Sequence, residues 1–270
     1  MIRPPAVAGQ FYPDNPEELA ALVQQYTREP NQHEKIHAKA CLVPHAGYVY
    51  SGHVAGAVFS RIVLPKRIII LGVRHYPRGE PLAILSAGKW RTPLGDARID
   101  EDLAKRVCAA CPALREDEVA HRSEHSLEVE LPFLQALDPE FTFVPIAVGT
   151  IRFQELANVG EGLARVLAES GENILVVTSS DMNHYEDDER TRQKDRQAID
   201  CMLSVDASGL YDVCRQESIS MCGLGPTVVM LTALEKLGVP RGVLVKYATS
   251  GDIAGDRERV VGYAGMLFAE

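Results

Sequence analysis

The sequence predicts an α/β protein, a single three-layer αβα domain with a mostly parallel or mixed central sheet. Short apolar runs rich in β-branched residues alternate along the chain with amphipathic segments of helical length. The run at 67–72 is apolar after its first residue, as a strand buried on both faces requires. No Ser/Gly-rich or Pro-rich linker interrupts the 270 residues, so we expect one domain over 1–270.

The first half of the chain begins with a helix and then alternates. Helices are predicted at 14–26, 54–62 and 101–111, and strands at 40–43, 67–72 and 82–85. Asp14 or Asn15 is a suitable cap for the first helix. Pro44 ends the first strand because proline cannot donate to a sheet ladder. Gly47 and Gly52 are interpreted as a turn before the next helix.

The second half repeats this alternation. Strands are predicted at 141–148, 174–178, 243–248 and 260–268, and helices at 153–169, 189–203, 210–214 and 227–237. A further helical segment opens near Glu124 and continues to Leu137, with Pro132 as an irregularity. Pro226 lies near the first turn of the last helix, where proline is tolerated.

Composition excludes several classes of function. The formal net charge of −9 argues against nucleic acid or an anionic membrane surface as the main partner, because both need clustered Lys and Arg. No apolar stretch approaches the roughly 18 residues of a membrane span, and the first residues lack the apolar core of a signal peptide, so a cytoplasmic protein is expected. Six cysteines are too few for a disulfide scaffold, and the C-x-x-C pair Cys108 and Cys111 lies inside a predicted helix and is interpreted as core.

Polar residues follow three of the predicted strands at their carboxyl ends. His45 follows 40–43, His75 follows 67–72, and Asp181 and His184 follow 174–178. The carboxyl ends of parallel strands share one edge of a sheet, where open α/β folds place their ligand sites. The pattern therefore predicts one shared site. His33, His37 and His121 lie in polar surroundings and are expected to be solvated, and His53 is expected on a helix face.

Cys222 is the remaining candidate for chemistry. Gly223 and the helix that follows would place its sulfur near a helix N-terminus, where the helix dipole favours the thiolate. Thiolate and imidazole are suitable ligands for zinc, copper or iron. A buried core cysteine is the alternative interpretation.

Motifs along nearly the whole chain carry a family resemblance. The chain reads R-P-P-A-V-A-G-Q-F-Y-P, P-H-A-G-Y-V-Y-S-G, L-G-V-R-H, E-H-S-L-E-V-E-L-P-F-L, S-S-D-M-N-H-Y and C-G-L-G-P, in this order. This combination resembles the Memo family, whose prokaryotic members are also called AmmeMemoRadiSam system protein B. The resemblance implies a fold similar to the LigB-type class III extradiol dioxygenases, with a mononuclear metal cleft. It also implies a radical SAM protein and an AMMECR-type protein as partners.

The resemblance assigns roles position by position. It implies that His45, His75 and Cys222 are the metal ligands, with Asp181, His184 and His125 as the catalytic side chains of the same cleft. Among these, His184 would be the acid or base, Asp181 would orient it by accepting a hydrogen bond, and His125 would be a nearby polar group. Arg74 departs from the family pattern, in which Asn often precedes the second histidine, and this departure concerns the surroundings of the ligand.

Three readings of function follow. Two histidines and one anionic ligand leave open positions on a non-haem iron. With this donor set, the resemblance implies a metal-dependent oxidoreductase of the extradiol dioxygenase type, with iron(II) as the expected ion and copper or zinc as alternatives. The alternative is a non-catalytic module that receives a small-molecule or peptide ligand in the same cleft, with Arg74, Tyr48 and Tyr185 supplying recognition. A zinc hydrolase is a third reading.

Overall fold

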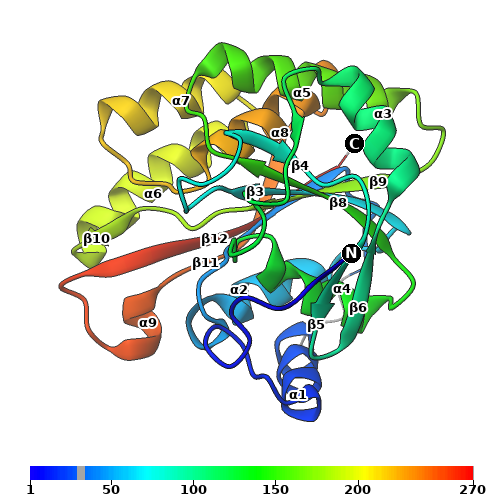
Figure 1. The fold of residues 1–270 in the computed structure, drawn as a ribbon. Helices are drawn as coiled ribbons and strands as arrows, with labels where there is room; N and C mark the ends of the chain where they lie inside the picture. The colour runs from blue at the N-terminus through cyan, green and yellow to red at the C-terminus, as the bar shows by residue number, and fades with distance from the viewer. Residues whose placement is uncertain (29–33, 270) are drawn as a thin grey trace.

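The computed structural model describes residues 1–28 and 34–269, and in this part of the chain it has α/β architecture (Figure 1). The helices are α1 (Pro16–Thr27), α2 (Tyr48–Phe59), α3 (Glu101–Ala110), α4 (Leu131–Leu137), α5 (Phe153–Ala168), α6 (Asp188–Leu203), α7 (Ala207–Gln216), α8 (Leu224–Lys236) and α9 (Ser250–Ala254), with a short 3-10 helix, η1 (Glu128–Glu130), before α4. The strands are β1 (Ile2–Arg3), β2 (Ala40–Val43), β3 (Arg67–Val73), β4 (Leu82–Ile84), β5 (Lys89–Thr92), β6 (Gly95–Ile99), β7 (Arg115–Glu116), β8 (Thr142–Val148), β9 (Ile174–Ser179), β10 (His184–Glu186), β11 (Gly242–Thr249) and β12 (Val260–Phe268).

The strands form one mixed sheet. Within the described residues its order is β1-β5-β6-β8-β3-β9-β2-β12-β10, with β11 paired to β12, and β4 paired to β8 and β7. The central strands β8, β3, β9 and β2 are mutually parallel, whereas β12 runs antiparallel to β2 and to β11. The carboxyl ends of β3, β9 and β2 therefore lie side by side at one edge.

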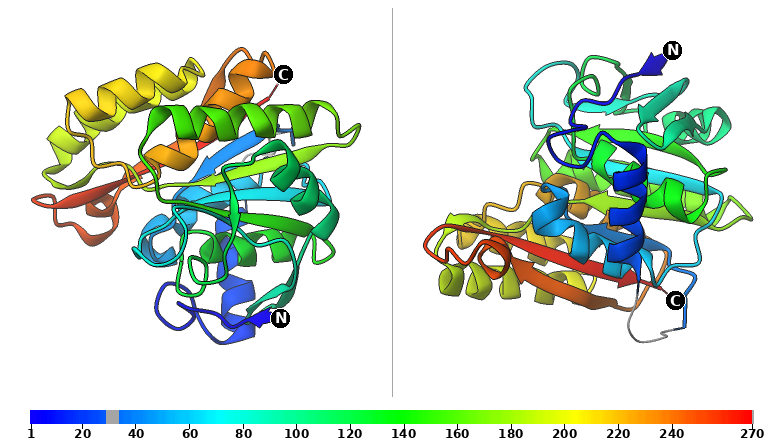
Figure 2. Two further views of the ribbon diagram at one scale, coloured as in Figure 1. Left: turned by 45° about the horizontal axis from the view of Figure 1, so that its top comes forward. Right: turned by 90° about the horizontal axis from the view of Figure 1, so that it is seen from below.

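Helices cover both faces of the sheet (Figures 1 and 2). Helices α3, α5, α6, α7 and α8 lie on one face, and α1, α2 and α4 lie on the other. Each face has its own apolar core, built from alternate residues of the same buried strands. The expected three-layer αβα arrangement with a mixed sheet is confirmed. No helix in the described ranges is both long and apolar enough to cross a membrane.

The largest difference from the predicted elements concerns α2. This helix begins at Tyr48 with Gly47 as its N-cap, so Gly52 lies inside the helix and not in a turn. A Cβ at Gly52 would lie 2.6 Å from Cε2 of the Tyr26 ring, so the glycine allows α1 and α2 to pack closely. The strands β1, β5, β6, β7 and β10 were also not predicted. Each has five residues or fewer, and in β5 and β6 buried residues alternate with exposed or half-buried ones, so neither forms an apolar run.

Three of the predicted histidine environments can be compared with the structure. His53 lies in α2, as expected, and is half-buried. His121 is fully buried and not solvated, because its ring lies edge-on to Trp90 under the N-terminal segment. His37 is exposed as expected. His33 lies outside the described residues.

Candidate metal site

The site lies where three parallel strands end. His45 follows β2 by two residues, His75 follows β3 by two, and Asp181 follows β9 by two. Because β2 and β3 both pair in parallel with β9, the three loops leave the sheet on the same edge. These strand-end residues therefore lie at one edge of the sheet, as the sequence predicted.

A fourth segment joins the strand ends from the loop before η1. The Ser126 hydroxyl accepts a hydrogen bond from the Val73 backbone N–H (2.9 Å) and lies 3.2 Å from the Val73 carbonyl oxygen. Gly72 allows this approach, since a Cβ there would lie 2.5 Å from Cγ of Leu127. The end of β3 therefore fixes His125 next to His75.

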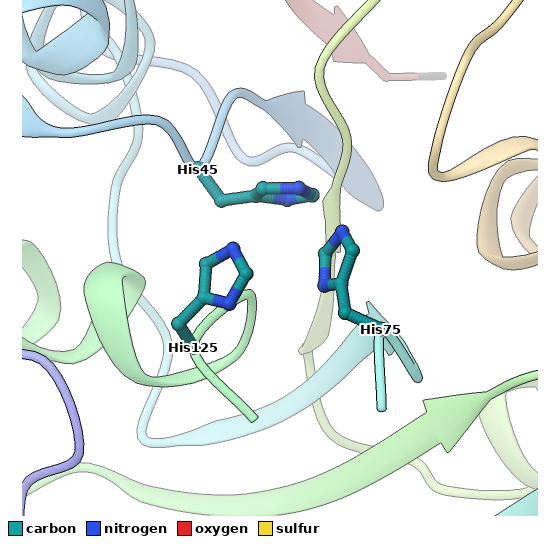
Figure 3. Close-up of side chains that lie close together, drawn as sticks. All are labelled: His45, His75 and His125. Atoms are coloured by element: carbon teal, nitrogen blue, oxygen red, sulfur yellow. The ribbon is translucent and has the colours of Figure 1, made fainter. Parts of the chain in front are cut away.

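The imidazole rings of His45, His75 and His125 converge on one space (Figure 3). Their ring centroids are 5.1 Å apart for His45 and His75, 5.5 Å for His45 and His125, and 4.4 Å for the stacked pair His75 and His125. One ring nitrogen from each lies within 4.8 Å of the others, a separation that a single metal ion could bridge. His125 was expected as a catalytic side chain near the ion and not as a ligand, and it belongs to this cluster of three.

Hydrogen bonds hold Nδ1 of two of these rings. The Glu124 carboxylate lies 2.8 Å from Nδ1 of His75, and it also accepts a hydrogen bond from the His75 backbone N–H at 2.7 Å. Since a carboxylate only accepts, the proton of neutral His75 lies on Nδ1 and the lone pair on Nε2. Nδ1 of His45 is likewise held, at 2.8 Å from the Ser179 hydroxyl. Both rings are thus left with Nε2 for a ligand.

The charges of the site favour a cation. Burial, followed by the neighbouring His75, lowers the pKa of His45 to about 3, and burial together with His45 lowers the pKa of His125 to about 4. Burial acts to raise the pKa of Glu124, but the hydrogen bond and charge of His75 outweigh it and lower the pKa to about 2. Near neutral pH, His45 and His125 are uncharged and Glu124 is an anion.

Cys222, the residue before the N-cap of α8, contacts the site at His45 and is not part of the three-histidine cluster. Its Sγ lies 3.2 Å from Nε2 of His45 and accepts a hydrogen bond from the Asp181 backbone N–H at 3.3 Å. Gly223 permits this approach, since a Cβ there would overlap the Cβ of Ser180. Burial and the charge of Asp181 raise the pKa of the Cys222 thiol, so the metal-free protein carries the thiol despite the nearby helix N-terminus.

A cavity of about 310 Å³ opens beside the histidines. Its walls include Phe11, whose ring lies 4.8 Å from that of His125, together with His184 and Tyr185. Nδ1 of His184 lies 2.8 Å from the carbonyl oxygen of Ser220, to which it donates. The cavity therefore lies between a possible ion position and the imidazole of His184, whose Nε2 is not used by that bond.

The predicted partnership of Asp181 and His184 has a different form. Asp181 lines the cavity, but its Oδ1 accepts a hydrogen bond from the His45 backbone N–H at 2.8 Å, and the Ser220 carbonyl holds Nδ1 of His184. Burial raises the pKa of Asp181. Asp181 thus orients the loop of His45, and Ser220 orients the ring of His184.

Of the three proposed recognition residues, only Tyr185 lies at the cavity. Tyr185 is 65% exposed and has φ of 63°, a left-handed conformation that is rare for an aromatic residue. Tyr48 is buried, and its hydroxyl donates to the Val129 carbonyl at 2.6 Å. The Arg74 guanidinium donates to the Gly79 carbonyl at 2.9 Å.

Sequence reasoning missed three residues that shape the site, namely Glu124, Ser179 and Phe11. Glu124 immediately precedes His125, and a carboxylate next to a candidate histidine is a signal that could have found it. The other two contact the site only through the tertiary fold.

Comparison with known proteins identifies the family. The family model for Memo-like proteins matches residues 3–267. This chain belongs to the Memo-like family. A MEMO1 family protein of Aquifex aeolicus is 43% identical over 269 residues, and one of Archaeoglobus fulgidus is 42% identical over 267 residues; each alignment covers 99% of both chains.

A solved structure shares the fold of this Memo-like chain at low sequence identity. The crystal structure of an uncharacterized protein from Escherichia coli K12 superposes with a TM-score of 0.53 and 12% identity, covering 83% of this chain and 98% of the other. At that identity the similarity concerns the fold alone. Membership in the Memo-like family and a three-histidine cluster that could hold a metal ion are the conclusions these observations support.

Proposed function

We propose that this Memo-like protein binds one divalent metal ion, iron(II) foremost, and acts as a metal-dependent oxidoreductase on a small molecule in the adjoining cavity. One observation carries the proposal. His45 and His75 each have Nδ1 tied to a protein group, which leaves both Nε2 atoms for a shared ligand in the cluster with His125. This is how proteins fix metal-binding histidines.

The donor set fits a redox-active ion. We assign His45, His75 and Cys222 as ligands, because the 3.2 Å between Sγ and Nε2 of His45 is a separation that two neighbouring ligands of one ion can have. His125 would be a further nitrogen donor or a hydrogen-bonding group beside the ion. Two imidazoles with one anionic ligand leave coordination positions open, and a bound iron or copper would supply electron transfer and Lewis acidity there. Zinc suits the same donors and would supply only the latter.

The remaining side chains would position and protonate the substrate. Burial keeps His125 neutral near pH 7, so it can accept a proton or a hydrogen bond. His184 presents Nε2 at the cavity wall, which is the placement of a general acid or base. Phe11 and Tyr185 supply apolar walls that would exclude water from one side of a bound ring or chain.

Anaerobic metal titration tests the proposal. Purified protein stripped with a chelator is titrated with iron(II), and separately with cobalt(II) as a spectroscopic probe. We expect one ion per chain and a sulfur-to-cobalt charge-transfer band that Cys222→Ser removes. His75→Ala should abolish tight binding, whereas the exposed His37→Ala is the matched control and should bind as wild type. Failure of the wild-type protein to bind either ion would refute the proposal.

Oxygen uptake tests the catalytic part separately. The iron(II)-loaded protein is mixed with catechol as a probe of extradiol-type activity. We expect uptake in the wild type that His184→Ala reduces by about 100-fold while iron content is unchanged. A full complement of iron with no uptake on catechol or on related diphenols would retain the metal site and reject dioxygenase activity.

The exposure of Tyr185 favours a second candidate, a ligand-binding role without catalysis. Its ring lies at the cavity rim, and the guanidinium of Arg259 lies 5.6 Å from the ring centroid. This arrangement could hold a peptide or an anionic ligand. This role predicts that a captured ligand still binds His75→Ala protein and is lost in Tyr185→Ala. The oxidoreductase proposal predicts the opposite order of sensitivity.

A further inference from the structure

A buried hydrogen-bonded chain runs from the candidate metal site into the core. Nδ1 of His45 lies 2.8 Å from the Ser179 hydroxyl, and that hydroxyl donates to Oε1 of Glu130 at 3.0 Å. Ser179 and Glu130 are both fully buried, and His45 is 2% exposed. A carboxyl group in this position has no role in the site as described so far.

We propose that Glu130, acting through Ser179, is a positioning residue that holds His45 in the tautomer presenting Nε2 to the ion. The proposal rests on the metal site of the proposed function, and it concerns how that site is selected and kept ready. In this proposal Glu130 acts on His45 through Ser179, whereas Glu124 acts on His75 by direct contact.

The direction of the hydrogen bonds carries the argument. The Ser179 hydroxyl has one proton, and it is donated to Glu130. Ser179 can then only accept from His45, so the proton of the neutral imidazole lies on Nδ1 and the lone pair on Nε2. If the Ser179 proton were donated to Nδ1 instead, His45 would carry its proton on Nε2 and could not bind a metal through that atom. The acceptor at Glu130 therefore decides which tautomer forms.

The Glu130 carboxyl contacts the Ser179 hydroxyl through Oε1. Among the described residues, Oε2 of Glu130 has no hydrogen-bond partner, so Oε1 alone connects the carboxyl to the rest of the protein. Burial raises the pKa of Glu130. The assignment requires Oε1 to be the acceptor, as it is in the carboxylate and in a neutral carboxyl whose own proton lies on Oε2. A buried polar group of this kind with one satisfied atom is costly, and it calls for a function.

Nitrogen NMR of histidine-labelled protein tests the proposal without any metal. In metal-free wild-type protein near pH 7 we expect the His45 signals of an Nδ1-protonated ring. Glu130→Met removes the acceptor while keeping the length of the side chain, and Ser179→Ala removes the hydroxyl. In both variants we expect His45 to shift to the Nε2-protonated form, whose proton can be donated to the Cys222 sulfur 3.2 Å away.

Cobalt(II) affinity, measured by competition with a chromophoric chelator, is the second readout. We expect Glu130→Met and Ser179→Ala each to weaken binding by about 10- to 100-fold, and the double variant to be no weaker than either single one. Gln135→Met is the matched control, because Gln135 is a nearly buried polar residue on the adjoining α4 whose side chain bonds to Thr92 and Gly95. This variant should leave both readouts unchanged.

The outcomes separate this proposal from the metal site itself. A wild-type protein that binds no cobalt would refute the metal site, and the tautomer comparison would still decide the role of Glu130. His45 with an Nδ1 proton in the wild type and in both variants would overturn the proposal. Additive losses of affinity in the double variant would also overturn it, since independent structural damage adds and one shared chain does not.

Discussion

Asp195 of α6 gives the stability of this protein a pH dependence that one substitution should remove. Its carboxylate is fully buried, with Oδ1 accepting from the Asn183 backbone N–H at 2.9 Å and Oδ2 accepting from the Tyr247 hydroxyl at 2.7 Å. These two bonds do not compensate for burial, which raises the pKa of Asp195 to about 7. The segment it supports leads directly into His184.

The sign and size of the effect follow from the two pKa values. Between the reference value of 3.8 and about 7, native Asp195 holds its proton and unfolded Asp195 does not. The native state is therefore favoured fully below about pH 4, and this contribution is lost as the pH rises through 7. About two of the three pH units from 5 to 8 fall in this window at about 1.4 kcal/mol each, so the free energy of unfolding should fall by about 2–3 kcal/mol.

Urea unfolding of metal-free wild type and Asp195→Asn at pH 5 and pH 8 measures this change. Asparagine keeps an oxygen for Asn183 and an amide for Tyr247 but cannot ionise. The buried His45, His121 and His125 have lowered pKa values and make stability rise with pH below about 6.5, but they are common to both proteins and cancel in the difference. We expect the free energy of unfolding of the variant, relative to that of the wild type, to rise by about 2–3 kcal/mol from pH 5 to pH 8. A constant difference would refute the reasoning.

Two glycine substitutions test close approaches. Gly52→Ala would gain about 0.5–1 kcal/mol of helix propensity but lose about 1–3 kcal/mol to overlap with the Tyr26 ring. Urea unfolding should therefore find the variant less stable than wild type. A more stable variant would show that the Tyr26 ring moves aside freely. Gly223→Ala would push the Cys222 loop away from Ser180, so cobalt(II) titration should show a weaker sulfur-to-cobalt band and affinity lower by about tenfold. An unchanged band and affinity would contradict this reasoning, because the loop would then accommodate a Cβ without moving the sulfur.

The sequence was sufficient where one local rule decides the structure. Apolar runs of β-branched residues marked the buried strands, and β2 and β12 begin and end where they were predicted. The position of His45 and His75 after such strands then predicted that they meet, because the end of a parallel strand fixes which edge its loop occupies. The residues alone left Cys222 open between a ligand and a core cysteine, and only the family resemblance favoured the ligand, since the approach of Cys222 to His45 depends on how α8 packs against β9.

Sequence reasoning failed where a residue acts through a partner distant in the chain. Gly52 was interpreted as a turn because glycine favours turns locally, whereas its role is to admit Tyr26 from α1. His121 was expected in solvent because its neighbours are charged, yet the N-terminal segment covers it; the Arg3 guanidinium donates to its carbonyl at 2.7 Å. Neither partner can be read from a window of neighbouring residues.

The segment from Glu124 to Glu130 shows how much of the site depends on such partners. The carboxyl groups of Glu124, Glu128 and Glu130 in this segment are all fully buried, although acidic residues in such a pattern would locally indicate a solvated helix face. Glu124 holds His75, and Glu130 holds Ser179. Glu128 accepts hydrogen bonds from the Arg3 guanidinium, the backbone N–H groups of residues 6 and 7 and the hydroxyl of residue 12, which fixes the N-terminal segment whose Phe11 ring lies against His125. Since burying three carboxyl groups is costly without such contacts, the segment is better explained by the positions it gives to the three histidines than by the stability of the core.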